Sequence, residues 1–129
     1  MNAKQVIVMK KLPSLRTGKY IAQGSHASVG ALLALGGLDE SGENFVIPMS
    51  NPFVKDWITH RFKKVTLYVT TDEELREIHE NALKAGLSSV LIQDAGLTEF
   101  KGVPTLTAVG IGPDDAEKID TVTGHLPLF

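Results

Sequence analysis

Three side chains in residues 17–30, TGKYIAQGSHASVG, have the types and spacing for chemistry on a phosphate or an ester. In a helix of about 3.6 residues per turn, Lys19, Gln23, His26 and Gly30 lie on one narrow stripe. The stripe brings together an amine, a carboxamide and an imidazole. Such a group can contact a phosphate or a sugar, and an imidazole titrates near neutral pH. We therefore take Lys19, Gln23 and His26 as candidate catalytic residues.

Asp94 is the second candidate for chemistry, because it directly follows the apolar run VLIQ at residues 90–93. A carboxylate at the carboxyl end of a strand can orient an imidazole or accept a proton from water. An aspartate before Ala95 and Gly96 can equally cap a turn. His26 has a structural alternative too, because a single histidine on a helix often only packs or donates a hydrogen bond.

The elements that would position these residues follow from hydrophobic patterning. Short apolar runs predict four strands, and helical spacing with capping residues predicts three helices. The first helix is expected to begin at Thr17 and to pack on the core through Ala22, Val29 and Leu33. The expected strands are 5–9, 64–69, 90–93 and 105–111, and the expected helices are 17–35, 54–61 and 72–85.

The connections between these elements predict the fold. Helices join the first three strands, which predicts that these strands run parallel. Only residues 95–104 separate the last two strands, which is too short for a crossover helix, so the fourth strand is expected to be antiparallel. The prediction is an α/β fold, a three-layer α/β/α sandwich with a mixed four-stranded sheet. Ligands of such sheets bind beyond the carboxyl ends of the parallel strands, where Lys19 and Asp94 would meet.

Length and composition limit the function further. The 129 residues are expected to form a single domain, 1–129, with a loop insertion at 38–53. The chain has no cysteine, no HxxxH or HExxH pair and no GxSxG, so we expect neither a metal site nor a serine hydrolase. The N-terminus is too charged for a signal peptide and no apolar run is long enough to cross a membrane, which predicts a cytoplasmic protein.

Charge is distributed unevenly along the chain. Five of the 13 basic residues and none of the 15 acidic residues lie in residues 1–38. A basic N-terminal third on an acidic body suggests a local anionic partner. Lysines that merely flank a strand for solubility are the alternative.

Four segments in this order resemble the second type of peptidyl-tRNA hydrolase, an α/β family: QVIVMKK at 5–11, GKYIAQGSHASVG at 18–30, VLIQDAGLT at 90–98, and VGIGP with TGHLPLF at 109–113 and 123–129. SNPFVKDW at 50–57 is similar to the family as well. Two features depart from it. Leu97 stands where the family often has a basic residue, and residues 38–49 resemble an insertion.

The resemblance implies hydrolysis of the ester that joins a peptide to the 3′ ribose of tRNA, without a cofactor. For this reaction our hypothesis assigns Asp94 and His26 to positioning water or transferring a proton, and Lys19 and Gln23 to the oxyanion or the terminal phosphate. Thr98 would bind the ribose or a phosphate. The CCA end and the acceptor stem would meet further candidate contacts at Lys10, Lys11, Arg16, Ser25, Gly110 and Gly112.

Two other functions stay open at this point. The first is a tRNA-binding or adaptor relative that has lost turnover, which Leu97 and the insertion would permit. The second is a hydrolase or transferase acting on another, smaller ester. The oligomeric state is also open, with a homodimer among the options.

Overall fold

The structure, a computed structural model, describes residues 1–96 and 100–129. The expected site residue Thr98 and the family departure at Leu97 therefore lie outside the described residues. In chain order the elements are β1 (Ala3–Lys10), α1 (Thr17–Leu33), β2 (Gly37–Leu38), β3 (Phe45–Val46), α2 (Pro52–Asp56), the π-helical turn η1 (Trp57–Arg61), β4 (Lys64–Val69), α3 (Asp72–Lys84), β5 (Ser89–Asp94), β6 (Thr105–Asp115) and α4 (Ala116–Thr123).

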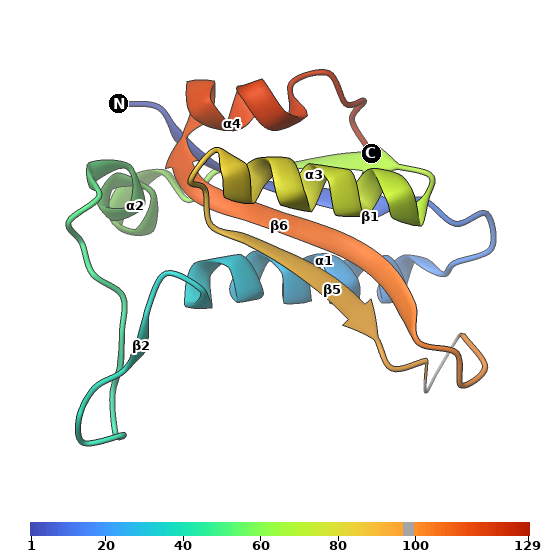
Figure 1. Ribbon diagram of the computed structural model, residues 1–129, viewed down its shortest axis with the longest axis horizontal. Coiled ribbons are helices and arrows are strands. Elements are labelled where there is room, and N and C mark those ends of the chain that lie inside the picture. The colour runs from blue at the N-terminus through green and yellow to red at the C-terminus, as the bar shows by residue number, and fades with distance from the viewer. Residues whose placement is uncertain (97–99) are drawn as a thin grey trace.

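The main sheet has four strands in the order β4-β1-β6-β5. β1 and β4 pair in parallel, with Val8 opposite Leu67. β6 is antiparallel to β1 on one side and to β5 on the other. Helix α1 covers one face of the sheet, and α3 and α4 cover the other (Figure 1). The predicted α/β class with a mixed four-stranded sheet is confirmed.

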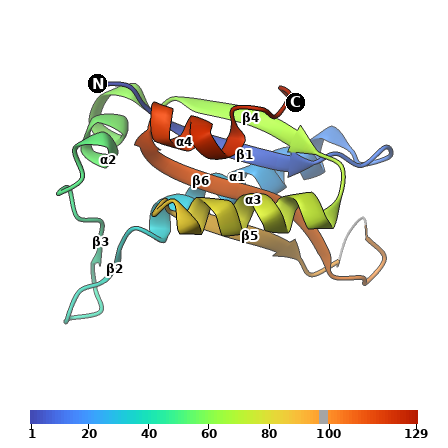
Figure 2. The ribbon, with the colours of Figure 1, turned by 45° about the horizontal axis from the view of Figure 1, so that its top comes forward.

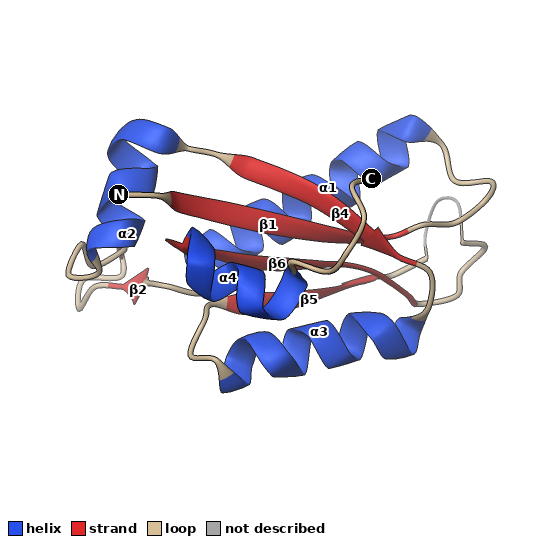
Figure 3. Cartoon of the chain, turned by 90° about the horizontal axis from the view of Figure 1, so that it is seen from above, coloured by secondary structure: helices blue, strands red, loops and turns tan. Residues whose placement is uncertain are grey.

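The directions of the strands agree with the prediction, because β1, β4 and β5 point the same way and β6 runs opposite to them. The structure adds the order of the strands: β6 lies between β1 and β5, so β1 with β4 is the directly paired parallel pair of the main sheet as the described residues form it (Figure 3). The reason is the character of β6, in which residues 106–114 are all buried. A strand buried on both faces is stabilised at the centre of a sheet, so the shorter and half-exposed β5 takes the edge.

The hydrophobic core has one part on each face of the sheet. Under α3 and α4, Leu75, Ile78 and Ile119 pack on Val6 and Val109. Helix α3 begins as predicted, because the Thr71 hydroxyl accepts a hydrogen bond from the Glu74 amide at 3.2 Å. This larger part of the core holds the strands in register, and it leaves the opposite face to α1.

Helix α1 packs on the sheet through small residues, which the sequence analysis did not expect. The buried stripe is Gln23, Ala27 and Ala31, whereas Val29 and Leu33 are 53% and 44% exposed and Ala22 is exposed too. Gly110 on β6 explains this orientation, because a Cβ there would lie 2.0 Å from the carbonyl oxygen of Ala27. The close approach of helix and strand therefore selects small side chains and turns the large ones outward.

The expected loop insertion, residues 38–53, contains short elements. β2 and β3 form a hairpin that extends away from the sheet, and α2 begins at Pro52 (Figure 2). Asp39 closes the hairpin turn by accepting hydrogen bonds from Ser41 and from the Gly42 amide. The predicted helix 54–61 is confirmed as α2 and η1, with Trp57 buried.

Candidate active site

Asp94 ends β5 and is held by donors from two elements. Its Oδ1 accepts hydrogen bonds from Lys19 Nζ at 3.0 Å and from Gln23 Nε2 at 3.1 Å, both on α1. Its Oδ2 accepts from the backbone N–H of Gly96 at 2.8 Å. The side chains of Lys19 and Asp94 are only 13% and 14% exposed. The first helix and the exit of β5 therefore share one site, as the sequence analysis expected.

Gln23 is fixed from its other end by Thr107. The Thr107 hydroxyl donates to Gln23 Oε1 at 2.6 Å, and both residues are about 1% exposed. This bond decides which way the amide lies, so the Nε2 donor points at Asp94. A β-bulge directs Thr107 there: Ile92 lies opposite Ala108 and Gln93 opposite Leu106, which leaves Thr107 without a partner in the ladder.

These contacts determine the charge of the site. The hydrogen bond from Lys19 lowers the pKa of Asp94 most, and burial opposes it in part. The Gly96 amide, the positive charge of Lys19 and the Gln23 amide lower that pKa further. Asp94 is therefore an ionised carboxylate at neutral pH. A carboxylate with a low pKa is a weak proton acceptor, so its chemical strength lies in orienting donors and holding negative charge in a fixed place.

Two further candidates on α1, His26 and Ser25, do not belong to the Asp94 cluster. His26 is exposed on α1 and makes no hydrogen bond or ion pair with any described residue. Ser25 is also exposed, and its hydroxyl donates to the Ile21 carbonyl oxygen within the helix. The stripe predicted for α1 is thus divided, because Lys19 and Gln23 reach Asp94 while His26 faces solvent.

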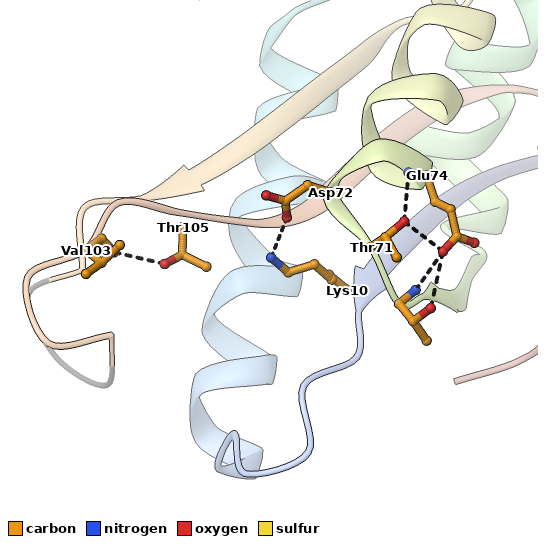
Figure 4. A network of polar contacts seen from close by, with 7 residues as sticks. Lys10, Thr71, Asp72, Glu74, Val103 and Thr105 are labelled. Atoms are coloured by element: carbon orange, nitrogen blue, oxygen red, sulfur yellow. Dashed lines mark hydrogen bonds and ion pairs between the residues drawn. The ribbon is translucent and has the colours of Figure 1, made fainter.

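Lys10 differs from the expected surface lysine. Its side chain is only 9% exposed and pairs with Asp72 at 2.6 Å, in the first turn of α3 (Figure 4). The expectation that Lys10 binds phosphate is not supported by this position, because the ammonium group already ties β1 to α3. Lys11 is exposed, with Nζ 4.6 Å from the centre of the Tyr68 ring, and Arg16 is exposed next to the start of α1.

Gly110 and Gly112 have structural positions, which corrects their expected role as substrate contacts. Both are buried in β6. Gly110 allows the close approach of α1, and Gly112 has a φ of +90° and precedes a cis peptide bond to Pro113. Glycine is the residue that adopts such a φ without strain.

Sequence reasoning missed Thr107 and Gly96 as members of the site. Thr107 offered one weak signal, a hydroxyl in an otherwise apolar strand. Gly96 offered a clearer signal, because an aspartate two residues before a glycine is typical of a capped turn. The hydrogen bond from the Gly96 amide to Asp94 confirms that alternative. Asp94 therefore has both roles at once: its Oδ2 caps the turn at Gly96, and its Oδ1 binds Lys19 and Gln23.

Among residues 1–96 and 100–129, no group of three or more His, Cys, Asp or Glu side chains is arranged to hold a metal ion. No helix there has the length and hydrophobicity needed to cross a bilayer.

Comparison with known families decides the membership of the chain. The sequence model described as "Peptidyl-tRNA hydrolase PTH2" matches residues 3–129. The chain belongs to this family. The PTH2 match contains both segments that build the Asp94 cluster, the first half of α1 and the exit of β5.

Individual relatives agree with the PTH2 assignment. The chain is 46% identical over 126 residues to a protein of Methanopyrus kandleri named peptidyl-tRNA hydrolase, covering 98% of this chain and 97% of that protein. Proteins with the same name from Methanocaldococcus jannaschii and Thermococcus onnurineus are 39% and 38% identical. The alignment with the M. jannaschii protein covers 98% of this chain and 99% of that protein, and the alignment with the T. onnurineus protein covers 97% and 96%. The similarity therefore extends along whole chains.

Proposed function

We propose that this chain is a peptidyl-tRNA hydrolase, which cleaves the ester between a peptide and the 3′ ribose of tRNA and releases both. The match of residues 3–129 to PTH2 carries this conclusion. The relatives with that name support it over nearly the full chain. We place the reaction in the cytoplasm, together with translation.

The reaction needs three kinds of help from the protein. Water must be placed against the ester carbonyl, the tetrahedral oxyanion must be stabilised, and the ribose leaving group must be held still. A buried cation beside a carboxylate and a fixed amide suits the first two tasks, because preorganised charges in a dry site need no reorganisation during the reaction.

We assign these tasks to the Asp94 cluster. A carboxylate has about four acceptor positions, and donors from Lys19, Gln23 and Gly96 use three of them. The remaining position lies on Oδ2 and would orient the attacking water. Lys19 would place its positive charge towards the developing oxyanion, with Asp94 and Gln23 fixing its direction. Thr98, outside the described residues, stays a candidate contact to the ribose or a phosphate.

His26 has the weaker claim to a part in proton transfer. It lies on α1 one turn beyond Gln23, but its side chain is exposed and separate from the cluster. Replacement of His26 is therefore expected to matter less than replacement of Lys19 or Asp94.

The tRNA would bind by charge near the start of α1. Lys11 and Arg16 are exposed there and suit the CCA end and the acceptor stem, where phosphate contacts give affinity without reading sequence. Lys10 is left out because it pairs with Asp72. The affinity for tRNA should fall as the salt concentration rises. A plot of the logarithm of the binding constant against the logarithm of the salt concentration should have a slope of about −0.7 to −0.9 per phosphate contact.

The experiment is release of a labelled N-acetylated amino acid from its tRNA, with uncharged tRNA as competitor. Hydrolysis with inhibition by uncharged tRNA is the expected result. Binding without release would instead indicate an adaptor, and release that ignores the competitor would indicate an esterase for smaller substrates.

A further inference from the structure

The face of the sheet that carries α1 has an open groove beside the helix. Its volume is about 1070 Å³. Ile7 and Met9 of β1 and Thr66 of β4 line it from the sheet, Tyr20 and Gly24 line it from α1, and Phe129 contacts Tyr20 edge to face with the ring centroids 4.9 Å apart. The groove exists because α1 packs on β1, β6 and β5 and leaves β4 uncovered on this side.

The lining is apolar and reaches solvent. Ile21 and Val29 on α1 are 65% and 53% exposed, and Phe62 is exposed at 58%. Two lysines are the charged residues among the described lining residues, and both lie over aromatic rings: Lys11 Nζ is 4.6 Å from the centre of Tyr68, and Lys64 Nζ is 3.3 Å from that of Phe62. An apolar surface of this extent is typical of a binding site.

The groove and the Asp94 cluster lie on two flanks of the same helical turns. Lys19 and Gln23 face Asp94, whereas their neighbours Tyr20 and Gly24 line the groove. Adjacent helical residues point about 100° apart, so one substrate can contact both flanks around the start of α1. The Tyr20 hydroxyl bonds the backbone of Leu12 at this end, which fixes the loop between β1 and α1.

We propose that this groove binds the peptide part of peptidyl-tRNA, with its C-terminal residue at the Lys19–Asp94 end. The inference rests on the proposed function. Lys11, at the start of the groove, is already assigned to the tRNA, and the rest of the lining is mainly apolar, which matches a peptide of varying sequence better than a polyanion. Such a peptide must be held by contacts that do not depend on particular polar groups.

The length of the groove sets how much peptide it holds. From Thr17 to Val29 the helix rises by about 18 Å, at about 1.5 Å per residue. An extended chain advances about 3.3 Å per residue, so roughly five residues fit along it. From the ester near the start of α1, the peptide would run along the helix towards its C-terminal end and Phe62.

The test compares two substrates of the full chain, N-acetyl-leucyl-tRNA and an N-acetylated apolar pentapeptidyl-tRNA. The wild type should show kcat/KM about tenfold or more higher for the pentapeptidyl substrate, because each buried apolar side chain adds about a factor of ten in binding. Thr66→Trp, which fills the groove from the sheet, and Val29→Asp, which charges the rim, should each remove this preference. Both should leave the rate on N-acetyl-leucyl-tRNA within about twofold.

Matched variants on the opposite face control for folding. Thr121→Trp on α4 and Leu83→Asp on α3 change exposed residues in the same way and should keep the preference. A wild type that hydrolyses both substrates equally would overturn the groove inference alone, and a wild type that hydrolyses neither would overturn the proposed function as well. If sedimentation shows a dimer that Thr66→Trp dissociates, with the preference intact, the groove binds a second copy and the inference is wrong.

Discussion

An Asp94→Asn variant is expected to hydrolyse peptidyl-tRNA at least about 10²-fold more slowly than the wild type under single-turnover conditions. The amide keeps the shape of the side chain but removes the negative charge that orients Lys19 and Gln23. It also replaces one acceptor oxygen by a donor, so either the Gly96 amide or the Lys19–Gln23 pair loses its partner.

The control for this variant is Asp120→Asn. Asp120 also pairs with a lysine, Lys4 at 2.5 Å, but on the exposed surface of α4. Its replacement should leave the rate unchanged within about twofold, since exposed pairs contribute little. A rate for Asp94→Asn within threefold of the wild type would show that the carboxylate has no part in the reaction.

The same contacts predict the pH dependence. Because the Lys19 hydrogen bond lowers the pKa of Asp94, the carboxylate stays ionised as the pH falls below neutrality. Its contribution to rate and to folding stability is therefore present above the ordinary aspartate pKa of about 3.9 and is lost as the pH falls through the lowered value. In the single-turnover measurements, the loss caused by Asp94→Asn should stay constant from about pH 8 to pH 5.

A Gly110→Ala variant is expected to lose about 3 kcal/mol of folding stability. The new Cβ would lie 2.0 Å from the carbonyl oxygen and 2.6 Å from the carbonyl carbon of Ala27. Both atoms are helix backbone, so α1 must move away from β6 to make room. Thermal denaturation should show a melting temperature lower by about 10 °C or more.

Gly37→Ala is the matched control, because apart from its chain neighbours no described residue has an atom within 4 Å of a Cβ at that position. It should change the stability by less than about 0.5 kcal/mol. Gly110→Ala should also lower activity, since α1 carries Lys19 and Gln23. An unchanged melting temperature for Gly110→Ala would contradict the close packing of α1 on β6.

How far the sequence predicts this molecule is seen best at α1. Its limits and the meeting of Lys19 with Asp94 follow from helical spacing and from the directions of the strands. Its orientation does not, because periodicity analysis gives weight to large side chains such as Val29 and Leu33. The contact is made by Ala27, Ala31 and Gly110, whose small size is the cause of the packing and gives little hydrophobic signal.

β6 and Thr107 show a second limit. The sequence predicts that the last strand is antiparallel to the one before it, but the order of strands depends on which is buried along its whole length. The bulge that turns Thr107 towards Gln23 depends in turn on pairing across β5, which no local pattern in residues 105–111 reveals. The position of Lys10 is likewise hidden from local patterns, because its partner Asp72 lies 62 residues away in the sequence.

The most direct test of the central claim, that α1 and the exit of β5 form one reaction centre, is a double-mutant cycle on Lys19→Ala and Asp94→Asn. Single-turnover rates of both variants and of the double variant would be measured on N-acetylated aminoacyl-tRNA. Groups that act as a unit lose their effect together. We predict that the double variant stays within about threefold of the slower single variant. A double variant slowed by the product of the two single losses would show that Lys19 and Asp94 act independently, and would contradict the shared site.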